Sequence, residues 1–292
     1  MYRDNKPFDL SPYDQPNIYP GPRPNSSFLF WKGKAHRMSG LKGLPLEQQS
    51  IYLSNTDHIL GSLAFNSFEE RKVEDFLGGS SIKEKIPVVA YGSNVCLAQL
   101  RYKFSLRPSD SDFMLCVKGE ITDSDIVYSS FLAPYGSLPA VIAPMKGAKT
   151  EVWITFMDED QLKLINATEK DYELREHTGK KLVLNTGEVF DKVYAYYVPK
   201  ALLWEGEMVR FKDIPSTSTL QEKWHIDMLD DLKKKVDFLG TREEFIHLLR
   251  WNFSYREFIE KFLREHTYEF EHPDWLPVEK ISTIGEMSRS FG

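Results

Sequence analysis

The pattern of apolar and polar residues divides the chain into three parts. In the central part, from residue 86 to about residue 198, short apolar runs between turn residues predict strands with only two helices. One helix is expected to begin near Val95. The other is expected at 159–167, where Asp158 and Gln161 are spaced as a capping box. The strands are expected at 86–91, 113–117, 126–132, 140–143, 151–156, 172–176, 181–184 and 193–198.

This succession of elements predicts the fold class. Many short strands with few helices favour an α+β protein with a mixed sheet or a small mixed β-barrel. A doubly wound parallel sheet would need a helix after nearly every strand. The helices are therefore expected to flank the sheet rather than alternate with its strands.

After residue 215 the pattern becomes helical. Gly240 is expected to end the first helix, and two capping boxes, Thr241 with Glu244 and Ser254 with Glu257, predict the starts of two more. The apolar faces of these helices are expected to pack into the core. In the first helix, apolar residues recur every four positions, at Leu220, Trp224, Met228, Leu232 and Val236.

The first 85 residues precede the strand-rich part. A stretch rich in Pro, Asn and Asp through Pro24 predicts irregular structure, 27–31 predicts a strand, and the Gly-Gly-Ser-Ser sequence at 78–81 is typical of a linker. We therefore expect an N-terminal extension packing on the core (1–85), a core (86–215), and a helical C-terminal region and tail (216–292), weakly ordered beyond residue 279.

Composition excludes several classes of protein. The 292 residues are 41% hydrophobic and 13% aromatic, which is enough to bury a sizeable core. The net charge of −6 gives no reason to expect a nucleic-acid partner. No apolar run approaches the ~20 residues that span a bilayer, and the N-terminus lacks the basic and apolar regions of a signal peptide. We expect a cytoplasmic protein without a membrane partner; the sequence does not set its oligomeric state.

Cysteine and histidine residues give weak signals for chemistry. Cys96 and Cys116 make no disulfide framework, and Cys96, between apolar neighbours, is expected to be buried rather than an activated thiolate. An ordinary hydrogen-bonded role is favoured for His177. No metal or cofactor is expected, because the spacing of the one loose cluster matches no metal signature: His266, Glu269, Glu271 and His272.

The sequence Val-Val-Ala-Tyr-Gly-Ser-Asn at 88–94 predicts a strand, a turn and the start of a helix. The first N–H groups of a helix lack intrahelical partners and lie at the positive end of its dipole, so such a turn can bind an anion. Gly92 permits close backbone approach or a positive φ, while Ser93 and Asn94 add short polar side chains. The alternative is an ordinary turn in which Asn94 only caps the helix.

Glu169 follows the helix expected at 159–167. The negative end of a helix dipole disfavours a charged carboxylate, and a site closed off from water would move the pKa from ~4.3 toward ~6. A glutamate with such a pKa can take up a proton and return it within one turnover. The alternative is a solvent-exposed carboxylate paired with Lys170 or Arg175.

The order and spacing of these features resemble the γ-glutamylcyclotransferase-like family. The resemblance covers roughly residues 86–235, about half of the chain. It implies a small mixed β-barrel with flanking helices, and cleavage of γ-glutamyl amides by internal cyclisation to 5-oxoproline without a cofactor. The matching stretches are Val-Val-Ala-Tyr-Gly-Ser-Asn at 88–94, Leu-Pro-Ala-Val-Ile-Ala-Pro at 138–144, Glu-Val-Trp at 151–153 and Leu-Ile-Asn-Ala-Thr-Glu at 164–169.

The resemblance also implies roles for individual residues. Glu169 would be the catalytic acid/base, and Tyr172 would line the pocket for a γ-glutamyl amine or peptide. The γ-glutamyl end of that substrate would be held by Tyr91, Gly92, Ser93 and Asn94. The chain departs from the family pattern because Lys170, rather than glycine, follows the glutamate, and the connection to Tyr172 is short.

Two other functions fit the same residues. One is a non-catalytic protein on the same fold that binds a carboxylate or an amine, or that docks a partner. The other is an amide hydrolase in which Glu169 activates water instead of an internal amine. The identity of the leaving amine stays open in each enzymatic interpretation.

Overall fold

Most strands of the protein join a single mixed sheet. The structure is a computed structural model and describes residues 8–55, 58–59, 62–63, 67–105, 113–177, 182–190 and 192–278. Fifteen strands of these residues form the sheet, and β4 (His58–Ile59) pairs separately with β5 (Ser62–Leu63). The first residue of the strand expected at 181–184 and the tail beyond residue 279 lie outside the described residues.

Strands predominate through residue 223 and three helices follow, but the N-terminal part has more strands than the one expected at 27–31, and two short strands follow the helices. The N-terminal strands are β1 (Phe28–Trp31), β2 (Lys34–Met38), β3 (Ser50–Leu53) and β6 (Glu69–Lys72). The central elements are β7 (Ile86–Ala90), α1 (Leu97–Ser105), β8 (Met114–Tyr128), β9 (Ala140–Met157), α2 (Glu159–Asn166), β10 (Glu173–His177), β11 (Leu182–Leu184) and β12 (Val193–Tyr197). The C-terminal elements are β13 (Lys200–Trp204), β14 (Glu207–Phe211), β15 (Gln221–Lys223), α3 (His225–Lys235), α4 (Arg242–Trp251), α5 (Phe253–Glu265), β16 (Thr267–Glu269) and β17 (Trp275–Pro277).

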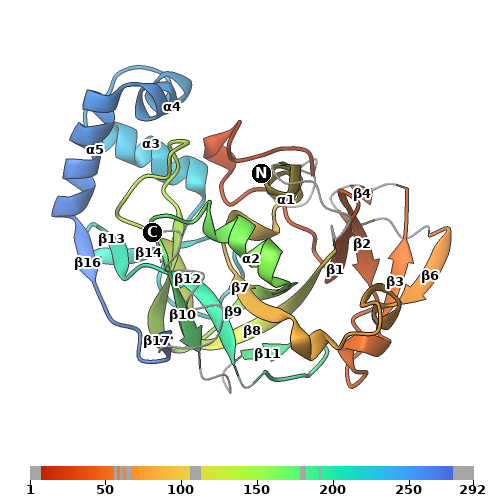
Figure 1. Ribbon diagram of the computed structural model, residues 1–292. Coiled ribbons are helices and arrows are strands. Elements are labelled where there is room, and N and C mark those ends of the chain that lie inside the picture. Colours follow the sequence, from red (N-terminus) through yellow and green to blue (C-terminus); the bar gives the residue numbers. More distant parts are fainter. Residues whose placement is uncertain are drawn as a thin grey trace.

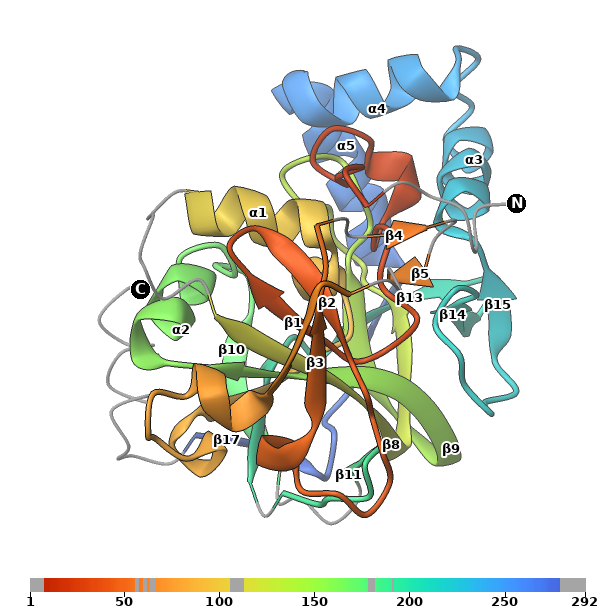
Figure 2. The ribbon, with the colours of Figure 1, turned by 90° about the vertical axis from the view of Figure 1, so that its right-hand side faces the viewer.

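The expected mixed α+β class is confirmed, whereas closure into a small barrel is wrong. Among the described strands, the path runs β17–β10–β12–β7–β9–β8–β1–β2–β3–β6 without pairing its two ends. Strand β8 pairs with β9 along one edge and with β1, β11 and β14 along the other. The N-terminal strands therefore extend the sheet outward from β8, and Figure 2 views the molecule from their side.

The hairpin of β8 and β9 forms the centre of the sheet. Each of these strands replaces two shorter strands expected from the sequence, because the polar interruptions do not end the pairing. In β8 the interruption is a register shift between Thr122 and Ser124, where Asp123 has a φ of 59°. A bulge of this kind bends a strand while the ladder continues beyond it.

Alternation along β7 divides its residues between the two faces of the sheet. Val88 and Ala90 belong to the core beneath α1 and α2, whereas Val89 belongs to the larger core on the other face. Figure 1 shows α1 and α2 next to each other over the sheet, with α3, α4 and α5 gathered at one end of the molecule. The turn that follows β7 and the segment that follows α2 thus lie on the same side of the sheet.

The C-terminal helices differ from expectation at their ends. Helix α3 begins at His225 rather than near Leu220, because 221–223 pair with β14 as strand β15. It ends at Lys235, before the expected stop at Gly240.

Two N-caps begin the last two helices. The capping box of Thr241 and Glu244 at α4 is confirmed. For α5 the expected cap is wrong, because the Asn252 side chain, not Ser254, accepts the N–H of the first turn. Within the described parts of the chain, no helix is long and apolar enough to cross a membrane.

Candidate functional site

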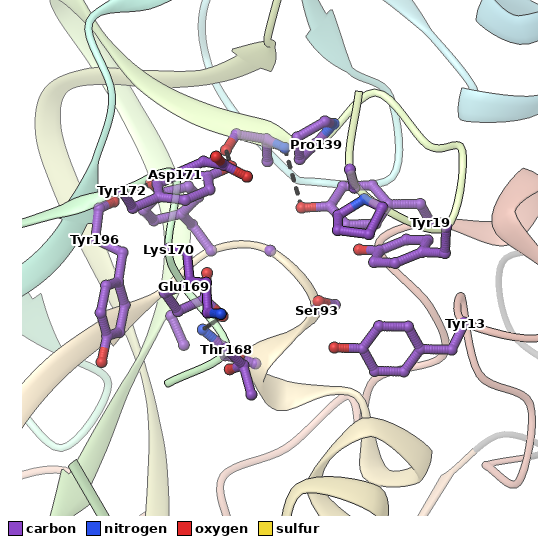
Figure 3. A pocket seen from close by; sticks show the side chains of 18 of the residues that line it. Tyr13, Tyr19, Ser93, Pro139, Thr168, Glu169, Lys170, Asp171, Tyr172 and Tyr196 are labelled. Carbon is purple, nitrogen blue, oxygen red and sulfur yellow. Dashed lines mark hydrogen bonds between the residues drawn. The ribbon is translucent and has the colours of Figure 1, made fainter. Parts of the chain in front are cut away.

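A pocket of about 100 Å³ lies where the chain leaves β7 and α2. Figure 3 shows Tyr13 and Tyr19 of the N-terminal segment on one side of it and the segment 168–172 on the other. All six residues expected in the site line this pocket: Tyr91, Gly92, Ser93, Asn94, Glu169 and Tyr172. The fold therefore brings together two sequence features. Asn94 and Glu169 are 75 positions apart in the sequence, yet their side chains are within hydrogen-bonding distance.

Gly92 gives the backbone the space for a close approach. It precedes the 3₁₀ helix Ser93–Val95, and its φ of −105° shows that a positive φ is not the reason for glycine here. A Cβ atom at this position would lie 2.6 Å from the hydroxyl oxygen of Tyr19. The same hydroxyl accepts the backbone N–H of Ala140 at 3.0 Å, so it is fixed in place.

Replacing Gly92 with alanine is expected to lower the free energy of unfolding by about 1–3 kcal/mol, the usual range for overpacking. The added methyl group forces either the turn or the Tyr19 ring to move. Urea unfolding would measure the loss. The double variant Gly92→Ala/Tyr19→Phe, which lacks the obstructing hydroxyl, should recover part of it relative to the sum of the single changes; full additivity would contradict this explanation.

Lys103 of α1 joins the two expected parts of the site. Its Nζ lies 3.0 Å from Glu169 Oε1 and 2.6 Å from Asn94 Oδ1, and Asn94 Nδ2 donates to the same Glu169 oxygen at 3.3 Å. The Lys103 side chain is 2% exposed and that of Glu169 is 16% exposed. Asn94 thus holds a lysine and a glutamate together, whereas Gly92 is the N-cap of the 3₁₀ helix.

Glu169 pairs with Lys103 and with neither of the two residues that the sequence suggested as its partner. Neither Lys170 nor Arg175 pairs with it: Arg175 pairs with Glu173 and Glu271. The ammonium group of Lys103 lies 3.0 Å from the Glu169 carboxylate and compensates its charge. Both hydrogen bonds reach Oε1, and no described residue donates to Oε2, which leaves that oxygen for a ligand.

The sequence contains a signal for the role of Lys103. In α1 the buried apolar residues Leu97, Leu100 and Phe104 form one face, and Lys103 lies on that face rather than on the solvent side. A buried lysine needs a charged or polar partner. Its position on the apolar face of the helix that follows the Tyr-Gly-Ser-Asn turn therefore pointed to a partner beside that turn.

Six tyrosines surround the ion pair with neutral phenol rings. Burial, reinforced by the Glu169 charge, raises the pKa of the Tyr13 hydroxyl to about 12. Burial is also the main cause that raises the pKa of the other five hydroxyls above the usual range, and the Glu169 charge and, for some of them, neighbouring tyrosines add to it. These hydroxyls are those of Tyr19, Tyr91, Tyr135, Tyr172 and Tyr196. All six rings therefore stay protonated at neutral pH.

Three of these tyrosines use their hydroxyls as donors within the protein, and that of Tyr196 donates to Asn166 Oδ1 at 2.5 Å. The Tyr91 hydroxyl donates to the Tyr196 carbonyl, and the Tyr172 hydroxyl donates to the Ala140 carbonyl at 2.9 Å.

Tyr13 and Tyr19 were missed because they lie in an irregular, proline-rich segment without any periodic pattern. The N-terminal extension thus supplies part of the pocket wall.

The other candidates for chemistry lie outside this pocket. Cys96 and Cys116 are both buried, as expected for Cys96. His177 is buried against the Trp275 ring, with the ring centres 4.7 Å apart. Across the described ranges, no group of three or more His, Cys, Asp or Glu side chains has the geometry to hold a metal ion.

Comparisons of the chain with known proteins add no further information about its function. No protein-family model, curated protein or solved structure matched it. The resemblance to the γ-glutamylcyclotransferase-like family therefore rests on the quoted sequence stretches. The function proposed for the chain is therefore argued from the chemistry of the pocket.

Proposed function

We propose that the protein is a γ-glutamylcyclotransferase-like enzyme. It would convert a γ-glutamyl amine or peptide into 5-oxoproline and a free amine. The observation that carries the proposal is Glu169, a carboxylate that lines a pocket with the turn 91–94. Its Oε1 is fixed by Lys103 and Asn94, while Oε2 has no donor among the described side chains. A carboxylate held in this way can exchange a proton through Oε2.

The proposed reaction moves two protons, one after the other, from the α-nitrogen to the departing amine through Glu169. Oε2 accepts a proton from the α-ammonium group of the substrate, and the freed nitrogen attacks the γ-carbonyl carbon. A C–N bond closes the five-membered ring and the original amide C–N bond breaks. The protonated glutamate then gives its proton to the departing amine, takes the second proton from the ring nitrogen and passes it to the same amine, so the products are a neutral lactam and an ammonium group. The reaction consumes no water and leaves the enzyme unchanged.

The pocket has to hold the substrate in its folded-back conformer. An attack within one molecule gains much of its rate from correct orientation, which the walls of a small pocket can impose. The phenol rings restrict water around the ion pair, and this strengthens electrostatic interactions there. Backbone donors of the turn 92–94, directed at a carboxylate or at the developing oxyanion, would contribute a few kcal/mol.

The proposed substrate is a small molecule, and the reaction requires neither a metal nor another cofactor. We retain the prediction of a cytoplasmic location, where reduced thiols such as Cys96 and Cys116 persist.

The ion pair itself supports a second candidate function. Glu169 already has a cationic partner in Lys103, and such a pair can be purely structural. In that case the pocket would bind a carboxylate or an amine without turnover. An amide hydrolase would use the same carboxylate to activate water.

Mass spectrometry after incubation of the purified protein with a panel of γ-glutamyl amines and peptides separates these functions. The proposed enzyme releases 5-oxoproline and the free amine. A hydrolase releases free glutamate without 5-oxoproline, and a binding protein returns every compound unchanged. Either of the last two results would contradict the proposed cyclisation.

A further inference from the structure

A second, larger cavity adjoins the pocket. Its volume is about 520 Å³. Phe131 and Asp171 line both cavities, so the two spaces share a wall. The remaining walls come from the loop after β8, from β13, and from α5 and β16. Helix α5 and strand β16 lie beyond residue 235, outside the part of the chain that resembles the γ-glutamylcyclotransferase-like family.

Helix α5 fixes the loop that contributes residues to both cavities. The Arg256 guanidinium donates to the carbonyl oxygens of Leu132 at 2.6 Å and Ala133 at 3.1 Å, and pairs with Glu260 at 2.8 Å. Leu132 lines the larger cavity and Ala133 lines the smaller pocket. Because Arg256 uses its donors in these contacts, it holds the wall of the larger cavity rather than a ligand.

Arg264 is the cation of the larger cavity that is best placed for a ligand. Lys200, which also lines the cavity, lies directly opposite Glu269 in the register of β13 and β16. A cross-strand carboxylate compensates such a charge. Arg264, exposed in the last turn of α5, forms no ion pair with any residue that the structure describes. A guanidinium binds carboxylates with two parallel hydrogen bonds.

We propose that the larger cavity binds the leaving amine of the substrate, and that this amine is peptide-sized and carries a carboxylate that pairs with Arg264. The inference rests on the proposed cyclisation. With the glutamyl group beside Glu169, the scissile nitrogen lies near the shared wall, where the Asp171 carboxylate favours the released ammonium group. The rest of the leaving group then extends toward α5.

The test compares two substrates that differ only in charge. In both, a γ-glutamyl group is joined to a dipeptide that is the leaving group; one has a free C-terminal carboxylate and the other a C-terminal amide. For the wild-type enzyme we expect about a tenfold higher kcat/KM with the free carboxylate, mainly through KM, as one charge-assisted contact would give. Arg264→Gln should bring the ratio close to one, mainly by raising KM for the substrate with the free carboxylate.

Arg250→Gln is the matched control, because this arginine stacks on Trp251 and lines neither cavity. It should keep the wild-type ratio. Equal kcat/KM values for the two substrates in the wild type, or a ratio that persists in Arg264→Gln, would overturn the inference while 5-oxoproline release upholds the cyclisation. Absence of 5-oxoproline from both substrates would overturn both.

Discussion

Replacing Glu169 with glutamine is expected to slow 5-oxoproline release by on the order of a hundredfold or more. Glutamine has nearly the same shape and can still accept a hydrogen bond from Lys103 through its amide oxygen. It cannot take the proton from the α-ammonium group, so the nucleophile stays protonated. The loss should appear in kcat as well as in kcat/KM, because the proton transfer belongs to the chemical step.

Glu243→Gln is the matched control for this change. Glu243 is exposed in the first turn of α4 and does not line the pocket, so its replacement should leave the rate unaltered. Both variants should be assayed well below their unfolding temperatures, because the glutamine at position 169 also removes the charge that compensates Lys103. Undiminished turnover in Glu169→Gln would exclude the assigned role.

Local signals predicted much of the central region. The short apolar run of β7, the Gly-Ser-Asn turn and the capping box of α2 each depend on residues close in sequence, and the structure has all three. Closure of the sheet depends instead on distant pairing. β1 occupies an edge of β8, with Phe28 opposite Cys116, and no local pattern in either strand reveals that partner.

For the site too, the local parts were predictable from the sequence, but their relative position was not. The turn after β7 and Glu169 carry their own local signals, whereas the position of one relative to the other depends on the packing of α1 against α2. The contribution of Tyr19 depends on a contact with Ala140, 121 positions away, and an irregular segment gives no periodicity from which to infer it. Lys103 differs, because its place on the apolar face of α1 was visible in the sequence.

Replacing Lys103 with methionine is expected to slow 5-oxoproline release by about ten- to a hundredfold. Methionine fills the buried space but leaves Glu169 Oε1 and Asn94 Oδ1 without the ammonium that fixes them. A hydrogen bond to a charged group contributes about 1.5–3 kcal/mol, which corresponds to this range of rates if it is lost from the transition state. Lys261→Met, at an exposed position of α5, is the control.

A double-mutant cycle shows whether Lys103 acts through Glu169. If it does, Lys103→Met should slow the residual rate of Glu169→Gln by less than about threefold, because the carboxylate that the lysine positions is already absent. Equal factors in both backgrounds would mean that Lys103 acts independently of Glu169. Unfolding in urea gives a second readout: Lys103→Met alone leaves a partly buried carboxylate without its cation, so the double variant should be more stable than additivity predicts. A purely structural lysine would produce this stability coupling without the coupling in rate, and the two measurements together therefore distinguish a positioning residue from a packing one.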